Sequence, residues 1–401
     1  MNRLTRTAVT LAATLLFARA EAETFVHRFE AGSMFRALTV VDETVYINRR
    51  LSHRATILNR ITYKVLEERA DGSGLLSGEF RVSSKADAGA GAAWVTEQLY
   101  DSEYWETPAG RFEIGAEYFM PVVRHVPTFP ARELDPGDTW TAPGEERHDF
   151  REDFGIPEPY VIPFDVSYTY VGPAELDGKE VHLIEGSYAV FHEPGPPRSW
   201  EVAYPVRIAG FSELRIYWNA AEGRPERYDE SFRFVFDLST GDSVEYRGVA
   251  EGTYSEATPL DRKAVADELR EALGDIEGAS VAEDERGVSV TLENLRFVAD
   301  STRLLPGEEA KLALIAEVLS RFPERDVLVA GHTALAGTEE QRMSLSLARA
   351  RTVAELLAEL GARTPDRIVV EGYGAERPVA PNDTEANMAR NRRVEIVILE
   401  N

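Results

Sequence analysis

One basic residue lies among apolar residues in a helix that the sequence predicts near its end. Four residues of that helix share one apolar stripe at 100° per residue, namely Leu345, Val353, Leu356 and Leu360. Arg349 falls near the centre of the stripe, where a guanidinium is costly unless it is paired or opens into a pocket. Because its planar fork can donate two parallel hydrogen bonds to a carboxylate, Arg349 is a candidate for binding a carboxylate ligand. An internal salt bridge is the alternative.

Three further polar residues lie where predicted strands begin or end. Thr333 follows a strand and opens a loop, so its hydroxyl and the nearby backbone N–H groups are available either to a ligand or to the loop itself. Asn391 and Arg392 open the predicted last strand. Alternation places Arg392 and Arg393 on opposite faces, so at most one of them reaches a ligand. We favour Arg392, with a solvated basic strand end as the alternative.

Four sequence blocks carry a resemblance to a known family. They are Gly331-His332-Thr333, then Leu345-Ser346-Leu347-Ala348-Arg349-Ala350-Arg351-Thr352-Val353, then Gly372-Tyr373-Gly374 with Pro378 and Asn382, and finally Asn391-Arg392-Arg393-Val394-Glu395. Their order and spacing resemble the C-terminal domain of the OmpA family over residues 284–401. The resemblance implies a periplasmic domain that binds the peptide stem of peptidoglycan without catalysis, in which Arg349 reads a ligand carboxylate.

The chain departs from the pattern of this family at three positions. Family members usually carry an aspartate after Gly-His-Thr, where this chain has Ala334. The resemblance implies that this aspartate meets the ammonium of diaminopimelate, so half of the expected clamp is missing. Arg342 replaces a usual asparagine and Met388 a usual arginine. We therefore expect an altered pocket that prefers an ornithine-type stem, as in spirochaete walls, or that contacts another part of the peptide through Arg349 and Arg342.

Hydrophobic periodicity predicts an α/β fold for this last domain. The expected order is β-α-β-α-β-β, with a strand pair at 280–292, helices at 306–322 and 339–360, and strands at 327–330, 368–370 and 394–399. Such helices can cover one face of a mixed sheet. The chain is therefore expected to have several domains, of which this one is the last.

The preceding region, residues 23–254, is expected to be all β. Its runs at 37–47 and 160–171 alternate between apolar and polar residues, and all five tryptophans of the chain lie in it. Many long strands favour a barrel-like or sandwich domain with room for an inner cavity. A lined cavity of a few hundred cubic ångströms would favour a carrier of lipids or small molecules. Residues 255–283 are expected to form a helical linker and a lead-in strand.

A catalytic or metal site is not expected. His148, Asp149, Glu152 and Asp153 offer possible metal ligands, but no spaced ligand pair accompanies them, and a solvated polar loop explains them better. The chain has no cysteine, which removes thiolate sites and disulfides. We therefore expect no catalytic residue, metal or cofactor.

The N-terminus and the charge indicate where the protein works. Residues 1–22 have basic residues, a short apolar run and then small residues, an order typical of a signal peptide that is removed after Ala20 or Ala22. The net charge of -25 argues against a nucleic-acid partner. No later stretch is long and apolar enough to cross a membrane as a helix. The expected location is the periplasm, with the outer membrane or cell wall as the site of attachment.

Three functions remain open from the sequence. The leading one is a non-catalytic envelope protein that binds peptidoglycan through residues 284–401 and tethers the β-rich domain, with other outer-membrane or periplasmic proteins as further candidate partners. The second is an envelope scaffold that has lost wall binding, for which Ala334 is the supporting feature. The third is an envelope enzyme with its site in the β-rich domain.

Overall fold

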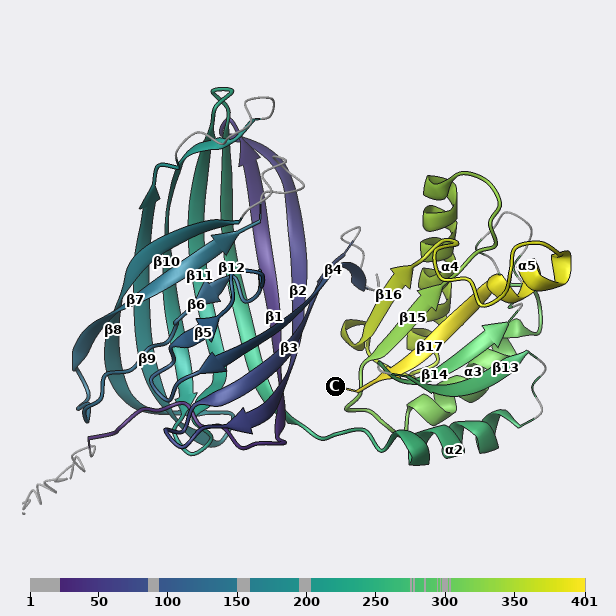
Figure 1. Cartoon of the computed structure of the whole chain (residues 1–401), viewed down its shortest axis with the longest axis horizontal. Coiled ribbons are helices and arrows are strands. Elements are labelled where there is room, and N and C mark those ends of the chain that lie inside the picture. The colour runs from purple at the N-terminus through teal and green to yellow at the C-terminus, as the bar shows by residue number, and fades with distance from the viewer. Residues whose placement is uncertain are drawn as a thin grey trace, which may run out of the picture.

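The computed structural model describes residues 22–400 apart from 86–93, 150–158, 195–202, 298–301 and the single positions 275, 277, 285, 294, 296 and 303. The expected signal peptide therefore lies outside the described residues, except for Ala22. A β-rich domain and an α/β domain lie side by side (Figure 1). The predicted multidomain fold, an all-β domain followed by an α/β domain, is thus confirmed.

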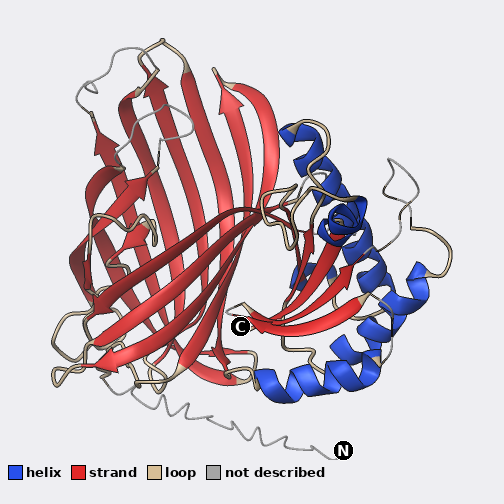
Figure 2. Cartoon of the chain, turned by 45° about the vertical axis from the view of Figure 1, so that its right-hand side comes forward, coloured by secondary structure: helices blue, strands red, loops and turns tan. Residues whose placement is uncertain are grey.

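Long antiparallel strands build the first domain. Its strands are β1 (Met34–Ile47), β2 (Arg50–Glu68), β3 (Gly74–Ser84), β4 (Trp94–Glu106), β5 (Phe112–Ile114), β6 (Val123–Arg124), β7 (Thr139–His148), β8 (Tyr160–Leu176), β9 (Lys179–His192), β10 (Pro205–Asn219), β11 (Arg224–Leu238) and β12 (Ser243–Ala257). They pair in the order β5-β4-β3-β2-β1-β12-β11-β10-β9-β8-β7-β6, always antiparallel. The sheet curls strongly into a barrel-like shell (Figure 2).

Alternation of side chains explains why these segments form one curved sheet. In β8 every second residue from Ile162 to Tyr170 is buried, while the residues between them mostly face solvent. The buried residues join those of β9, β10 and β11 in an aromatic-rich core that includes Trp218. The period of two in the sequence therefore predicted the inner face of the sheet correctly.

The second domain begins with a helix that follows the last strand of the β-rich domain. Its elements are α2 (Arg262–Leu273), β13 (Ala279–Asp284), β14 (Gly287–Glu293), α3 (Glu308–Leu319), β15 (Val327–Gly331), α4 (Glu339–Glu359), a short 3-10 helix η1 (Pro365–Arg367), β16 (Ile368–Gly372), α5 (Glu385–Asn391) and β17 (Arg393–Leu399). The strand order is β13-β14-β17-β15-β16, with only β15 and β16 parallel. The sequence analysis did not predict α5. Asn391 is the last residue of this helix, whereas it was expected to open the last strand.

Helices α2, α3 and α4 cover one face of this sheet. Their apolar residues form one core with alternate residues of β14 to β17, and Leu312, Val329 and Ile396 all belong to it. The opposite face is turned toward the β-rich domain (Figure 2). No helix in the described part of the chain is long and apolar enough to span a membrane.

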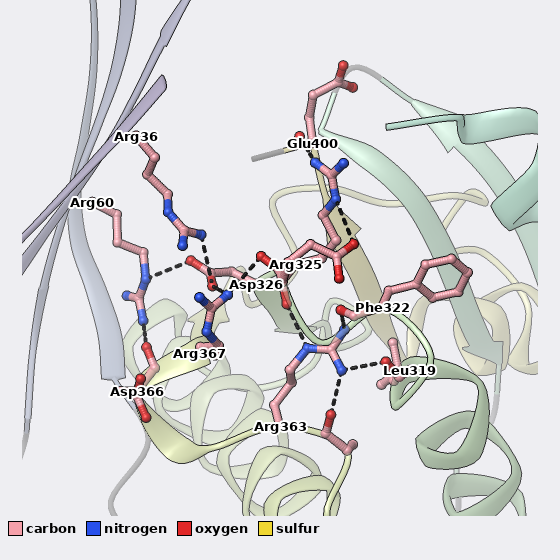
Figure 3. Close-up of polar contacts among 12 residues, drawn as sticks. Arg36, Arg60, Leu319, Phe322, Arg325, Asp326, Arg363, Asp366, Arg367 and Glu400 are labelled. Carbon is pink, nitrogen blue, oxygen red and sulfur yellow. Dashed lines mark hydrogen bonds and ion pairs between the residues drawn. The ribbon is translucent and has the colours of Figure 1, made fainter. Parts of the chain in front are cut away.

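A buried carboxylate joins the two domains. Asp326, just before β15, accepts a hydrogen bond from Nε of Arg60 at 3.1 Å and from Nη1 of Arg36 at 3.4 Å, both from the β-rich domain (Figure 3). A third arginine, Arg367 of η1, donates at 3.2 Å. Arg60 also donates to the backbone carbonyl of Asp366. Burial lowers the pKa of Arg60 to about 10 despite the nearby Asp326, so its guanidinium is still charged at neutral pH.

Two further contacts extend this junction. Strand β16 pairs in parallel with β4 at Val369 with Trp94 and at Val370 with Val95, which makes the two sheets continuous. Beside this pairing, Arg81 of β3 forms an ion pair with Glu371 of β16. The two domains are thus joined by backbone pairing at the edge strand β16 and by charged side-chain contacts.

We expect Asp326→Asn to weaken the junction. The substitution removes the charge that three arginines share and leaves buried guanidinium groups without compensation, which typically costs about 3 to 5 kcal/mol. Urea unfolding should show this loss, and limited proteolysis between residues 254 and 284 should become faster. Asp366→Asn is the matched control, because that side chain is exposed and only its backbone carbonyl meets Arg60. Equal stability of the wild type and Asp326→Asn would contradict the role given to this carboxylate.

Candidate functional site

Three segments meet where the parallel strands β15 and β16 end. Parallel strands have their carboxyl ends at the same edge of a sheet, so the loops that follow them are neighbours. The backbone N–H of Thr333 donates to the carbonyl of Gly374 at 2.7 Å, and that of Tyr373 donates to the carbonyl of Gly331 at 2.9 Å. Helix α4 begins at this edge too, with Thr338 as its N-cap. These loops and the first turns of α4 form the candidate site.

Small residues let α4 lie directly on the strand ends. A Cβ on Gly331 would collide with the carbonyl oxygen of Ser346, and a Cβ on Gly372 would collide with Leu347. Ser346 is fully buried, and its hydroxyl accepts a hydrogen bond from the N–H of Gly374 at 2.9 Å. The glycines in the sequence blocks therefore set how closely the helix approaches both loops.

Thr333 has an unsatisfied hydroxyl at this edge. The residue is only 7% exposed, and its Oγ1 has no hydrogen-bond partner among the described residues. A buried hydroxyl without a partner costs about 1 to 3 kcal/mol, so a ligand that supplies one gains that interaction. The alternative that this hydroxyl bonds its own loop does not occur in the structure.

The next residue, Ala334, adds no charge to the site. It is buried, and the loop beyond it is held by Asn382, whose Oδ1 accepts from the N–H of Leu335 at 3.0 Å. Arg342, in the first turns of α4, donates from Nη1 to the carbonyl of Gly337 at 2.6 Å. Its Nε is buried without a partner among the described residues. Arg342 thus borders the same loop as Thr333 and Ala334.

Asn391 holds the loop that follows β16. Its side chain is fully buried, and Oδ1 accepts from the N–H groups of Val379 at 2.9 Å and Ala380 at 3.0 Å. Its Nδ2 donates to the carbonyl of Ala380 at 2.8 Å and to Oδ1 of Asn382 at 2.9 Å. The side chain of Asn391 therefore positions the loop through hydrogen bonds to the backbone of that loop. The sequence did not single out Asn382 for the site, although its place in a family block was the available signal.

Arg349 lies further along α4, beside Phe297. Its guanidinium carbon lies 4.9 Å from the ring centre of Phe297, an arrangement in which the aromatic face attracts the cation. The predicted apolar stripe was wrong in part, because Leu360 is 42% exposed and the buried face of α4 runs through Ala350, Ala354 and Leu357. Arg349 is half-buried at the border of this face and not at its centre.

The two arginines before Val394 have different surroundings. Arg392, the one that the sequence favoured, lies near the surface and pairs with Glu385 of α5. Arg393 is buried and donates to Oε1 of Glu395 from Nε at 3.0 Å and from Nη2 at 2.7 Å. The two thus lie in different environments, and only Arg392 keeps an exposed side chain.

A buried charge cluster lies beneath the first loop. Glu395 of β17 meets Arg393, Arg286 at 3.0 Å and Nε2 of His332 at 3.4 Å. Burial opposes the charge of Glu395, but these partners outweigh burial and hold its pKa well below the usual range. Burial also lowers the pKa of His332, which favours the neutral ring at pH 7. The cluster gives the Gly331–Thr333 loop a rigid base.

A metal centre is not found in the described part of the chain, where no group of three or more histidine and acidic side chains is arranged for one. His148 lies 2.9 Å from Oε2 of Glu146. Asp149 is described as well, whereas Glu152 and Asp153, the remaining members of the sequence cluster, lie outside the described residues.

The last domain is an α/β domain in which two loops follow a parallel strand pair and lie against one long helix. Residues 296–392 match the OmpA family, and the last part of the chain is therefore an OmpA-family domain. The resemblance in the four sequence blocks is confirmed. The β-rich domain lies outside this match.

Three relatives match this chain over 24 to 30% of its length. Peptidoglycan-binding protein ArfA of Mycobacterium bovis is 36% identical over 110 residues, which are 27% of this chain and 33% of the relative. The peptidoglycan-associated lipoprotein of Legionella pneumophila is 39% identical over 97 residues, which are 24% of this chain and 52% of the relative. A solved outer membrane protein from Borrelia burgdorferi is 31% identical, with 30% of this chain and 96% of that chain covered and a TM-score of 0.26.

These matches span about a third and about half of the two curated relatives. The names of both relatives refer to peptidoglycan.

We expect Asn391→Ala to loosen the loop after β16. Removal of the amide leaves the N–H groups of Val379 and Ala380 without acceptors, at about 1 to 3 kcal/mol of folding stability for such buried groups. Chemical unfolding measures the loss, and amide exchange of residues 379–382 should become faster. Asn387→Ala on the same helix removes only a surface hydrogen bond to Asp383 and serves as the control. Unchanged exchange in Asn391→Ala would show that the loop is held by other contacts.

Proposed function

We propose that residues 284–401 bind the stem peptide of peptidoglycan without catalysing a reaction, and thereby tether the β-rich domain to the cell wall. The observation that carries this proposal is the match of residues 296–392 to the OmpA family, whose relatives here include a peptidoglycan-binding protein and a peptidoglycan-associated lipoprotein. The protein then works in the periplasm, at the wall or the outer membrane.

The chemistry of the site is consistent with an anionic peptide end. Arg349 offers a planar fork that can donate two hydrogen bonds to a carboxylate, and Thr333 has a hydroxyl that lacks a partner among the described residues. Arg342 borders the same loop and has a buried Nε available. A ligand carboxylate would supply an acceptor to the Thr333 hydroxyl and to Nε of Arg342, which lack hydrogen-bond partners among the described residues. Asn391 contributes by holding the opposite loop, and Arg392 by the positive charge at its end.

A second candidate function follows from one residue. Ala334 places a buried methyl group where family members usually carry an aspartate. A domain that lost this carboxylate could act as an envelope scaffold that no longer binds the wall. Binding of the purified protein to isolated cell walls distinguishes the two functions, because only the first predicts that the protein sediments with them.

We expect Arg349→Ala to abolish sedimentation with purified peptidoglycan. Truncation of one partner of a desolvated charge pair typically costs about 2 to 5 kcal/mol, which is a thirtyfold or larger loss of affinity. The domain should remain folded by circular dichroism, since Arg349 is only half-buried.

The matched control for this experiment is Arg351→Ala, which removes the same side chain from the same helix two residues on. It should sediment as the wild type does. Wild-type binding by Arg349→Ala would mean that this arginine has only a structural role, and the pocket assignment would then be wrong.

The identity of the stem peptide can be tested at Ala334. An aspartate there would accept a charge-assisted hydrogen bond from the ammonium of diaminopimelate. Its absence should weaken binding to that stem by about ten- to a hundredfold, equivalent to roughly 1.5 to 3 kcal/mol. Calorimetry should therefore show that Ala334→Asp binds diaminopimelate-type muropeptides more tightly than the wild type, and that the wild type favours ornithine-type muropeptides.

Ala336→Asp is the control for this substitution, because it adds the same charge to an exposed position of the same loop. If the wild type binds the diaminopimelate stem tightly and Ala334→Asp adds nothing, another carboxylate already meets the ammonium. Glu339 and Glu340 in the first turn of α4 are then the nearest candidates.

A further inference from the structure

The curved sheet of the first domain encloses a cavity of about 550 Å³. Apolar and aromatic side chains from β1, β2, β10, β11 and β12 form most of its wall, together with the segment around Met120 to Val126. Its volume lies in the range of pockets that bury a small organic molecule, which is roughly 300 to 1,000 Å³. The cavity belongs to the domain that lies outside the OmpA-family match.

Two carboxylates lie on the cavity wall and are held by hydroxyl groups. The hydroxyl of Tyr188 donates to Oε1 of Glu146 at 2.7 Å, and the hydroxyl of Ser212 donates to Oε1 of Glu230 at 2.6 Å. Tyr188 and Ser212 face each other across β9 and β10, so the two carboxylates come close enough to repel each other. The sheet thus fixes a pair of acidic groups in an otherwise apolar space.

The carboxylates of the cavity are only partly paired with cationic groups of its wall. Glu43 and Glu230 take part in no ion pair among the described residues, and burial raises the pKa of both. Glu146 has His148 as its neighbour at 2.9 Å. Arg81 also lines the cavity, but its guanidinium is directed to Glu371 and Glu79. Three carboxylates therefore face the cavity, while the arginine is used elsewhere.

A buried carboxylate is costly unless it meets a cation or strong hydrogen-bond donors. Here the hydroxyl groups supply one donor to each of Glu146 and Glu230, which leaves further acceptor sites on both. An ammonium group has three donors and a positive charge, so it can bridge two such carboxylates. A fatty acid would instead place its own carboxylate beside those of Glu146 and Glu230.

We infer that the cavity binds an amphipathic molecule with an apolar body and a cationic amino head, and that Glu146 and Glu230 receive the head. The aromatic wall, which includes Phe232, Phe234 and Phe236, takes the apolar body. The inference concerns the β-rich domain and is independent of wall binding by the second domain.

Displacement of a neutral fluorescent reporter from the full mature chain tests the inference. N-phenyl-1-naphthylamine should become fluorescent on binding the cavity. At neutral pH, dodecylamine should displace it at a concentration about tenfold or more below that needed for dodecanoate, since the two probes share a chain and differ in the sign of the head charge. Equal displacement by both probes, or a preference for dodecanoate, would overturn the inference.

Variants locate the binding site. Glu146→Gln and Glu230→Gln keep the shape of the side chains and should each lower the preference for dodecylamine about tenfold, as expected for loss of one charge-assisted contact. Glu213→Gln is the control, because Glu213 is exposed on the outer face of β10, beside Ser212. It should leave the preference unchanged. A preference that survives in the double variant Glu146→Gln, Glu230→Gln would show that these carboxylates do not receive the head.

A second variant tests the apolar part of the site. Ala250→Trp fills the cavity from β12 and should abolish binding of the reporter and of both probes. Circular dichroism checks that this variant is folded. If it fails to fold, the glutamine variants still decide the inference, since they do not change the packing volume. Reporter binding by a folded Ala250→Trp equal to that of the wild type would place the binding site outside the cavity.

Discussion

The buried carboxylate of Asp326 determines how the two halves of the chain are joined. It lies directly before β15, the strand whose end carries the Gly331–Thr333 loop, and it accepts hydrogen bonds from arginines of both domains. Because three cations share one anion out of solvent, the pairing fixes which face of the second sheet meets the first domain. The Gly331–Thr333 loop lies at the opposite end of β15 from Asp326, whereas the ion pair of Arg81 with Glu371 reaches the end of β16.

The candidate site depends on backbone geometry more than on its charged side chains. Close packing of α4 on Gly331 and Gly372 brings two loops together, and Asn391 and Ser346 then hold those loops through hydrogen bonds to backbone groups. The open hydroxyl of Thr333 results from this arrangement. Arg342 borders the first loop from the start of α4, whereas Arg349 lies further along the same helix beside Phe297.

Much of this could be predicted from the sequence, because periodicity and family blocks are local signals. The α/β order, the all-β first domain and its room for a cavity all follow from runs of about ten residues. Helix α5 was missed since seven residues are too few to show a helical period. The buried face of α4 was misplaced because leucines suggested it, whereas close approach to the strands selects Ala350 and Ser346. The junction was not predictable, as Arg60 and Asp326 are 266 residues apart.

The parallel pairing of β16 with β4 also affects how the second domain behaves when it is separated from the first. Strand β16 is the last strand of its own sheet, and β4 covers part of its outer backbone. An uncovered edge strand offers free N–H and C=O groups on which another chain can add a strand, a common route to aggregation. The first domain therefore covers part of an aggregation-prone edge strand of the second domain, and a C-terminal fragment released by proteolysis would expose that strand.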